Sequence, residues 1–281
     1  MKKTIGIIGA GNMGGAIYQI LKKSRLAKRV YICDQHSDKI DALKARADVL
    51  SLRDLLTRSD IIILAVKPQS FKDLAEEIKI KVGDKIIVSI MAGVSTHTIS
   101  DLLGCDMDRS RPVRTKVVRA MPNMPAQIGQ GAIGWFANNH VVRTEKLEVA
   151  KLLSALGLVV EFKREALLDV VTAVSGSGPA YFFYLCEQLE AGAIKLGLDK
   201  KTARVLAEQT FWGSAALLKS KGVGAGELRQ AVTSRKGTTA AAIGILEKKG
   251  FAKIFECALS AAFKRAQELS NVIPNPRPQS G

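Results

Sequence analysis

Short apolar runs separated by helix-like segments fill the first 162 residues of the chain. Apolar and β-branched residues dominate seven stretches of strand length: 4–8, 29–33, 61–66, 86–90, 115–120, 129–136 and 158–162. Helical periodicity lies between several of them, at about 12–23, 39–45 and 144–156. The run I-I-I-L-A-V at 61–66 has no polar position, which is typical of a parallel strand covered on both faces. The pattern predicts an α/β fold with a doubly wound sheet.

The pattern changes at about residue 164. Beyond it the chain is alanine-rich with helical periodicity, which predicts helices at 165–173, 178–196, 200–220, 227–232, 238–249 and 251–271. Asp199 is a predicted N-cap, and glycines at 197, 222 and 250 mark the breaks between helices. Small-residue faces at 191–193 and 240–242 allow close helix approach. We therefore predict an all-helical dimerisation domain over 164–273, followed by a proline-rich, disordered tail at 274–281.

A glycine-rich turn joins the first predicted strand to the first predicted helix. Gly9, Gly11 and Gly14 fill the three positions of G-x-G-x-x-G, which serve the tight turn, the approach of a pyrophosphate and close helix packing. Free N–H groups at the helix start attract an anionic diphosphate. The motif alone has low specificity, but its place between a strand and a helix favours a dinucleotide site over a structural turn. We predict a Rossmann-type dinucleotide-binding domain over residues 1–163.

The choice of dinucleotide depends on the end of the second predicted strand. Asp34 lies twenty residues after Gly14, where an acidic residue hydrogen-bonds the adenosine ribose of NAD. An alternative is a 2′-phosphate, held by the polar residues that follow: Gln35, His36, Ser37 and Lys39. Asp34 can also serve only as a residue at the start of the next helix. The sequence leaves NADH and NADPH open.

Other strand ends and two polar loops carry further candidate chemistry. Lys67-Pro68 and M-P-N-M-P at 121–125 end strands where ligands bind in open α/β sheets, and Ser95 is placed to cap a short helix. In the helical half, S-G-S-G-P-A-Y at 175–181 and T-S-R-K-G-T-T at 233–239 each lead into a helix start. The second loop offers hydroxyls, N–H groups and two cations that suit a carboxylate, although helix capping explains its Ser and Thr equally well.

Composition and charge narrow the class of protein. The 281 residues are 47% hydrophobic and 24% charged, no apolar run approaches the ~20 residues of a spanning helix, and Met1-Lys2-Lys3 leads directly into a strand. We therefore expect a soluble, cytoplasmic protein. The net charge of +16 is spread along the chain without interleaved aromatic residues, which argues against a nucleic-acid partner. The four cysteines lack metal-ligand spacing, so we predict no metal site.

Together these segments resemble the Δ1-pyrroline-5-carboxylate reductases, the enzymes of the last step of proline biosynthesis. The resemblance runs over nearly the whole chain: G-x-G-N-M-G at 9–14, A-V-K-P-Q at 65–69, M-P-N-M-P at 121–125, S-G-S-G-P-A-Y at 175–181 and V-T-S-x-x-G-T-T-A-A-A-I at 232–243. It implies an N-terminal Rossmann domain, a C-terminal helical dimerisation domain and a homodimer, often in a ring of five dimers. The implied reaction is reduction of the cyclic imino acid to L-proline by NADPH or NADH.

The resemblance also implies site residues by position. Coenzyme contacts would come from Gly9, Gly11, Asn12, Met13, Gly14, Asp34, Ala65, Val66, Lys67, Pro68, Pro122 and Asn123. The substrate carboxylate would bind Ser234, Gly237, Thr238 and Thr239, with the Thr239 hydroxyl near the imine nitrogen as the catalytic group. Arg235-Lys236 stand where the family usually has Pro-Gly, and lysine reaches positive φ less easily than glycine. This departure leaves the conformation of the loop backbone open, and the two cations can compensate in part by attracting the carboxylate.

The histidine pattern agrees with imine reduction. His36, His97 and His140 all lie in the first half, so the helical half offers no histidine as a general base. A protonated iminium is already electrophilic and accepts hydride directly, which leaves alignment and exclusion of water to the protein. The alternative enzyme class, the β-hydroxyacid dehydrogenases, uses a lysine on a helix, and the segment 177–193 contains none. A nucleic-acid binder is the non-enzymatic alternative.

Overall fold

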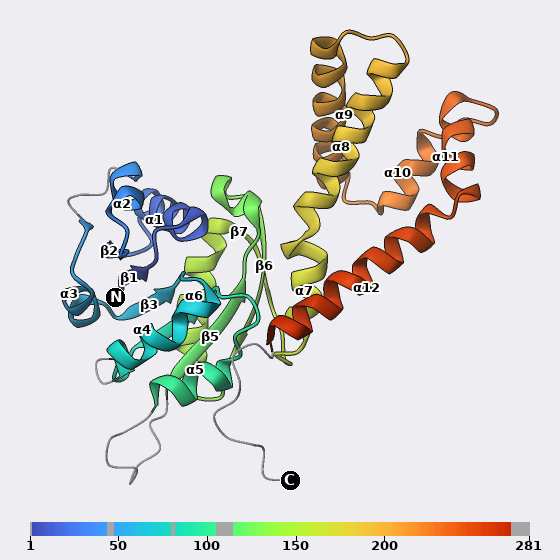
Figure 1. The fold of residues 1–281 in the computed structure, drawn as a ribbon. Helices are drawn as coiled ribbons and strands as arrows, with labels where there is room; N and C mark the ends of the chain where they lie inside the picture. Colours follow the sequence, from blue (N-terminus) through green and yellow to red (C-terminus); the bar gives the residue numbers. More distant parts are fainter. Residues whose placement is uncertain (1, 44–47, 80–81, 105–114, 271–281) are drawn as a thin grey trace, which may run out of the picture. The chain divides into compact units, whose positions relative to one another are not determined.

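The computed structural model of the protein describes residues 2–43, 48–79, 82–104 and 115–270 (Figure 1). The contacts divide it into two compact units. We call the first, built from 1–177 together with 262–281, the sheet unit, and the second, built from 178–261, the helical unit. The predicted tail at 274–281 lies outside the described residues.

The sheet unit contains a seven-stranded sheet in the order β2-β1-β3-β4-β5-β6-β7. Its strands are β1 (Thr4–Ile8), β2 (Arg29–Cys33), β3 (Ile61–Leu64), β4 (Ile86–Ser89), β5 (Lys116–Met121), β6 (Gly131–Ala137) and β7 (Gly157–Glu161). All neighbouring pairs are parallel except β5 and β6. The strand order reverses beside β1, which creates the crevice that binds ligands in this class of sheet. The predicted α/β fold with a doubly wound sheet is confirmed.

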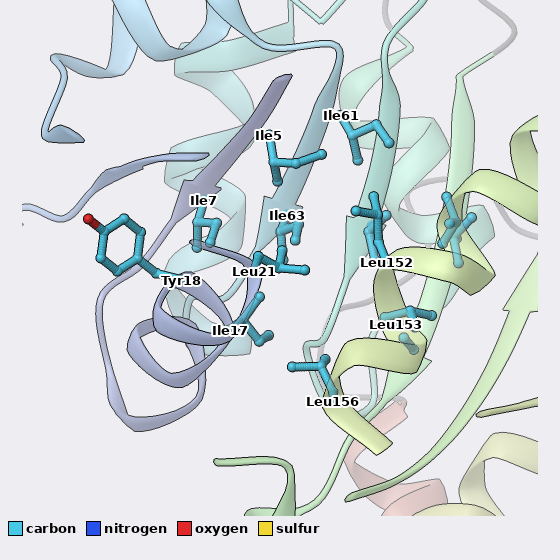
Figure 2. Close-up of a cluster of buried hydrophobic side chains, with 14 of the residues drawn as sticks. Ile5, Ile7, Ile17, Tyr18, Leu21, Ile61, Ile63, Leu152, Leu153 and Leu156 are labelled. Atoms are coloured by element: carbon cyan, nitrogen blue, oxygen red, sulfur yellow. The ribbon is translucent and has the colours of Figure 1, made fainter. Parts of the chain in front are cut away.

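Helices cover both faces of the sheet, because the strands are apolar on both sides. In β3, Ile61 and Ile63 join one hydrophobic cluster, whereas Ile62 and Leu64 join the other. The first cluster lies under α1 (Asn12–Ser24) and α6 (Arg143–Leu153), as the side chains in Figure 2 show. The second is covered by three helices: α3 (Leu52–Arg58), α4 (Phe71–Ile78) and α5 (Thr96–Leu103).

The helices α3 and α4 were not predicted from the sequence. Each is short, with seven residues in α3 and eight in α4, so its apolar face repeats only once or twice. In α3 that face consists of Leu52, Leu55 and Leu56, and the Ser51 hydroxyl accepts a hydrogen bond from the Asp54 N–H as an N-cap. The short helix α2 (Ser37–Ala42) and the predicted Ser95 cap of α5 are both present.

A π-helical turn separates the two units. The predicted helix at 165–173 is shorter than expected: α7 spans Leu167–Val171 and continues as a π-helical turn, Thr172–Gly176. The Ser177 N–H donates to the Thr172 carbonyl at 2.8 Å, five residues back. α7 packs on β5 and β6 and therefore belongs to the sheet unit. The helical unit begins at residue 178, which is 14 residues after the predicted domain boundary at 164.

The helical unit consists of α8 (Gly178–Lys195), α9 (Lys200–Lys221), α10 (Ala225–Ala231), α11 (Thr238–Lys248) and the first part of α12 (Phe251–Ser270). Asp199 caps α9 by accepting hydrogen bonds from the Lys201 and Thr202 N–H groups, as predicted. Gly222 ends α9 in the left-handed region with φ 66°. Among the helices that the structure describes, none combines the length and apolarity needed to cross a membrane.

Candidate functional site

The glycine loop between β1 and α1 is packed so tightly that side chains are excluded at two positions. Gly9 has φ +107°, and a Cβ there would lie 2.5 Å from the Ala65 carbonyl oxygen at the end of β3. A Cβ on Gly14 would lie 2.0 Å from the Gly9 carbonyl oxygen. At Gly11, by contrast, a Cβ would meet nothing within 4 Å. The loop is therefore closed towards the protein and open at the middle glycine, as a pyrophosphate site requires.

The start of α1 has backbone donors for an anion. Gly11 is the N-cap of α1, and no side chain caps the helix. The first N–H groups of a helix have no partner within it, and the helix dipole favours negative charge at this end. Open space at Gly11 and an uncapped helix start together fit a dinucleotide diphosphate.

Asp34 has the predicted spacing, but its carboxylate is bound to the protein itself. One oxygen, Oδ2, accepts a hydrogen bond from the Ala10 N–H at 2.7 Å, and Oδ1 accepts from the His36 N–H at 2.9 Å. The side chain is only 9% exposed, whereas His36 is exposed beside it. Burial raises the pKa of the Asp34 carboxyl, but the hydrogen bonds from Ala10 and His36 outweigh burial and lower the pKa below its ordinary value. Asp34 thus stays ionised and ties the glycine loop to β2.

The strand ends at β3 and β5 carry the other predicted coenzyme residues. Ala65 and Val66 are half-buried beside the glycine loop, and Lys67 is exposed at the start of the 3-10 helix η2 (Pro68–Ser70). Pro122 and Asn123 follow β5 and are buried. The structure thus brings Gly9, Gly14 and Ala65 into contact.

The predicted substrate loop forms a tight turn before α11. The Gly237 N–H donates to the Ser234 carbonyl at 3.0 Å, and Lys236 has φ +60°. A positive φ only at the third residue is the pattern of a type II turn. The backbone therefore does adopt the left-handed conformation, at a cost of about 1 kcal/mol for lysine relative to glycine.

The start of α11 is also uncapped. Gly237 is its N-cap, and no side chain supplies a capping hydrogen bond, so Ser234 does not act as a helix cap here. A Cβ on Gly237 would lie 2.3 Å from the Ser234 hydroxyl oxygen, which shows how closely that hydroxyl sits over the turn. Thr238 begins α11, and Thr239 is half-buried. Hydroxyls and unpaired N–H groups are thus gathered on one turn, where a carboxylate can bind.

A buried ionic cluster behind β5 was missed by the sequence reasoning. The Arg119 side chain is 5% exposed and donates to Asp169 Oδ1 at 3.0 Å and, more weakly, to Glu165 Oε1 at 3.4 Å. Glu165 also accepts hydrogen bonds from the N–H and hydroxyl of Thr96. The only sequence signal was an arginine in the middle of an apolar strand.

Cys33, the last residue of β2, carries a free and buried thiol. Burial raises the pKa of the Cys33 thiol to about 12, with a further contribution from the negative charge of Asp34. Cys33 is therefore protonated and inert. Within the described ranges, no group of His, Cys, Asp and Glu side chains is arranged to hold a metal ion.

Comparison with known proteins matches both units. Residues 165–269 match the family described as pyrroline-5-carboxylate reductase dimerisation, and residues 4–93 match the family described as NADP oxidoreductase coenzyme F420-dependent. The pyrroline-5-carboxylate reductase of Pseudomonas aeruginosa is 38% identical over 274 residues, which cover 96% of this chain and 97% of that protein. The Haemophilus influenzae reductase is 34% identical over 277 residues, covering 96% and 99%. The chain belongs to the pyrroline-5-carboxylate reductase family.

Solved structures agree with this assignment. The pyrroline-5-carboxylate reductase from Coxiella burnetii superposes with a TM-score of 0.87 at 35% identity, covering 97% of this chain and all of that one. The pyrroline carboxylate reductase of Plasmodium falciparum, solved with NADP bound, has a TM-score of 0.82 at 26% identity and covers 96% and 98%. Pyrroline-5-carboxylate reductases reduce Δ1-pyrroline-5-carboxylate to proline with NADPH or NADH. The predicted fold class, enzyme class and coenzyme class are confirmed.

The match to the dimerisation family explains why the helical unit exposes large apolar side chains. Large apolar side chains that are at least half exposed occur on several of its helices: Phe182, Phe183, Tyr184, Leu189, Val205, Leu206, Trp212, Ile245 and Ile254. Exposed apolar surface of this extent in a folded protein marks an interaction site. The match and the exposed surface support self-association through this unit.

Proposed function

We propose that this protein reduces Δ1-pyrroline-5-carboxylate to L-proline by direct hydride transfer from NADPH or NADH to the imine carbon, as the last step of proline biosynthesis. The observation that carries the proposal is the uncapped turn at 234–239, which lies inside the family match and presents hydroxyls and N–H groups to a carboxylate. The sequence after residue 164 contains no histidine, as expected for a reaction that needs no general base at the imine carbon.

Coenzyme binding is assigned to the sheet unit. The residues proposed to contact it are Gly9, Gly11, Asn12, Met13, Gly14, Ala65, Val66, Lys67, Pro68 and Pro122. Open space at Gly11 and the uncapped start of α1 support this assignment. When bound, the reduced nicotinamide supplies the hydride. Asp34 and Asn123 contribute by holding the backbone of this site, because the polar atoms of both side chains are bound to protein groups.

The end of β2 supports NADPH as the preferred coenzyme. Asp34 is turned to the Ala10 N–H and is nearly buried. Gln35, His36 and Ser37 are exposed there and Lys39 is half-buried, and these polar groups suit a 2′-phosphate.

The substrate is assigned to the turn of the helical unit. Ser234 and Thr238 hold its carboxylate through hydroxyl and N–H donors, with the positive end of the α11 dipole nearby. Gly237, whose N–H donates to the Ser234 carbonyl, shapes the turn beside the carboxylate. The Thr239 hydroxyl lies at the imine nitrogen and orients it. The exposed side chains of Arg235 and Lys236 add positive charge to the same turn.

Two substitutions in the turn test the proposed function. We expect Ser234→Ala to lower kcat/KM for the imino acid about tenfold or more, because a hydrogen bond to a charged group contributes roughly 1.5 to 3 kcal/mol. Thr239→Val preserves shape but removes the hydroxyl, and it should lower kcat more than it raises KM, because the contact strengthens in the transition state. Steady-state assays with each coenzyme, alongside melting temperatures, measure both effects.

The control for these variants is coenzyme affinity, which should be unchanged because that site belongs to the sheet unit. If both variants lose thermal stability but keep normal kinetics at low temperature, the turn is only structural. A wild-type protein that does not oxidise NADPH or NADH in the presence of the imino acid would refute the proposed reaction.

The proposed assembly is a homodimer through the helical unit, with a decamer of five dimers as its further form. The proposed location is the cytoplasm.

We expect Phe183→Glu on α8 to shift the protein towards monomer in sedimentation velocity at micromolar concentration. Phe183 is 54% exposed, and a carboxylate buried in an apolar interface is strongly unfavourable. Leu147→Glu is the matched control, since Leu147 is 63% exposed on α6 of the sheet unit. Equal sedimentation of the two variants would contradict the assignment.

A further inference from the structure

The side chain of Asn123 is fully engaged by backbone groups of two other segments. Its Nδ2 donates to the Ser175 carbonyl at 2.9 Å, and its Oδ1 accepts from the Ala132 N–H at 2.9 Å. The residue is 9% exposed. The amide therefore joins the loop after β5 to the start of β6 and to the π-helical turn, and both of its polar atoms are bound to these segments.

Local capping does not explain this side chain. Asn123 is the N-cap of the 3-10 helix η4 (Met124–Ile128), a position where asparagine commonly accepts a hydrogen bond from the following turn. No such bond is present at η4. The amide makes tertiary hydrogen bonds in its place.

The partner in the π-helical turn is a carbonyl without its regular donor. In an α-helix the Ser175 carbonyl would accept from the N–H of residue 179, but that residue is Pro179, which has none. Ser175 is half-buried, a carbonyl shielded from water is unfavourable without a partner, and Asn123 Nδ2 donates to this carbonyl. A Cβ on Gly176 would lie 2.8 Å from Met121 Cε, so the turn and the loop after β5 also pack closely.

We propose that Asn123 is a positioning residue for the coenzyme: it fixes the path of the loop 121–125 against the π-helical turn and so places Pro122 at the nicotinamide. The proposal rests on the proposed function, which places this loop at the coenzyme. It differs from a direct contact, because Asn123 acts through backbone that its amide holds. Small displacements of a reacting group lower reaction rates steeply. Loss of either hydrogen bond would let Pro122 and the nicotinamide shift, and hydride transfer would slow.

The test compares Asn123 with another asparagine that bridges backbone groups. We expect Asn123→Ala to lower kcat/KM about tenfold or more and to weaken NADPH binding several-fold. Asn123→Asp keeps the acceptor but loses the donor to Ser175, so it should reproduce most of the kinetic loss. Asn138→Ala is the control: Asn138 Oδ1 accepts from the Val117 N–H and its Nδ2 donates to the Thr115 carbonyl, beside the N-terminal end of β5.

Thermal stability separates positioning from a purely structural role. Both alanine variants should have lower melting temperatures, but only Asn123→Ala should change kinetics and NADPH affinity well below melting. If Asn123→Ala and Asn123→Asp keep wild-type kinetics and NADPH affinity there, the proposal is overturned. A wild-type protein that binds NADPH but does not reduce the imino acid refutes only the proposed reaction. In that case the NADPH affinities of the Asn123 variants still test whether Asn123 positions the coenzyme.

Discussion

Gly14→Ala is expected to abolish coenzyme binding. The added methyl carbon would lie 2.0 Å from the Gly9 carbonyl oxygen and 2.9 Å from Ala65 Cβ. Neither the Gly9 backbone nor the end of β3 can move away without opening the glycine loop. We expect no measurable NADPH binding by fluorescence titration and a fall in kcat/KM of about 100-fold or more.

The matched control for Gly14 is Gly226 in α10. A Cβ there meets nothing within 4 Å, and alanine is favoured over glycine in a helix by about 1 kcal/mol. Gly226→Ala should therefore bind NADPH normally and melt at an equal or higher temperature. Wild-type coenzyme affinity in Gly14→Ala would show that the loop is not the pyrophosphate site.

Arg119→Met is expected to give the largest loss of folding stability. The substitution keeps an apolar stem but removes the guanidinium from a site where its side chain is 5% exposed. The carboxyl groups of Asp169 and Glu165, whose side chains are 12% and 20% exposed, then lose their cation. Removing one partner of a buried ion pair typically costs about 3 to 5 kcal/mol, and urea unfolding measures this loss in the free energy of unfolding.

An exposed ion pair provides the comparison. Arg204 donates to Glu208 at 2.7 Å on α9, and both side chains are more than half exposed. Arg204→Met should change the free energy of unfolding by less than about 1 kcal/mol. If both arginine variants lose the same small free energy of unfolding, the buried ionic cluster contributes no more to stability than an exposed ion pair.

The strands were predicted to within two residues because apolar and β-branched residues dominate each one. The long helices of the second half were predicted equally well, since Asp199, Gly222 and Gly250 mark their ends. Local signals of this kind do not depend on the rest of the fold. The helices α3 and α4 are too short to show a clear period, and packing against the sheet stabilises them.

Features that depend on distant partners were not predictable. Arg119 pairs with residues 46 and 50 positions away in the sequence, and nothing in the local pattern identifies those two carboxylates. Pro179 follows the π-helical turn and has no N–H to donate to the Ser175 carbonyl. Asn123, 52 residues away in the sequence, donates to that carbonyl instead. Spacing correctly located Asp34 at the end of β2, whereas the glycine-loop geometry decided that its carboxylate accepts from Ala10.

The division of the chain into units has a consequence for synthesis on the ribosome. The sheet unit contains residues from both sides of the helical unit, and its last contacts come from the end of α12. The Ser270 hydroxyl donates to Asp169 at 3.3 Å, and the Leu269 backbone lies against Gly93. Since domains tend to fold as they emerge, the first 177 residues must wait for the whole helical unit to be translated before these contacts close. During that interval the nascent sheet unit lacks the hydrogen bond from Ser270 to Asp169 in its ionic cluster.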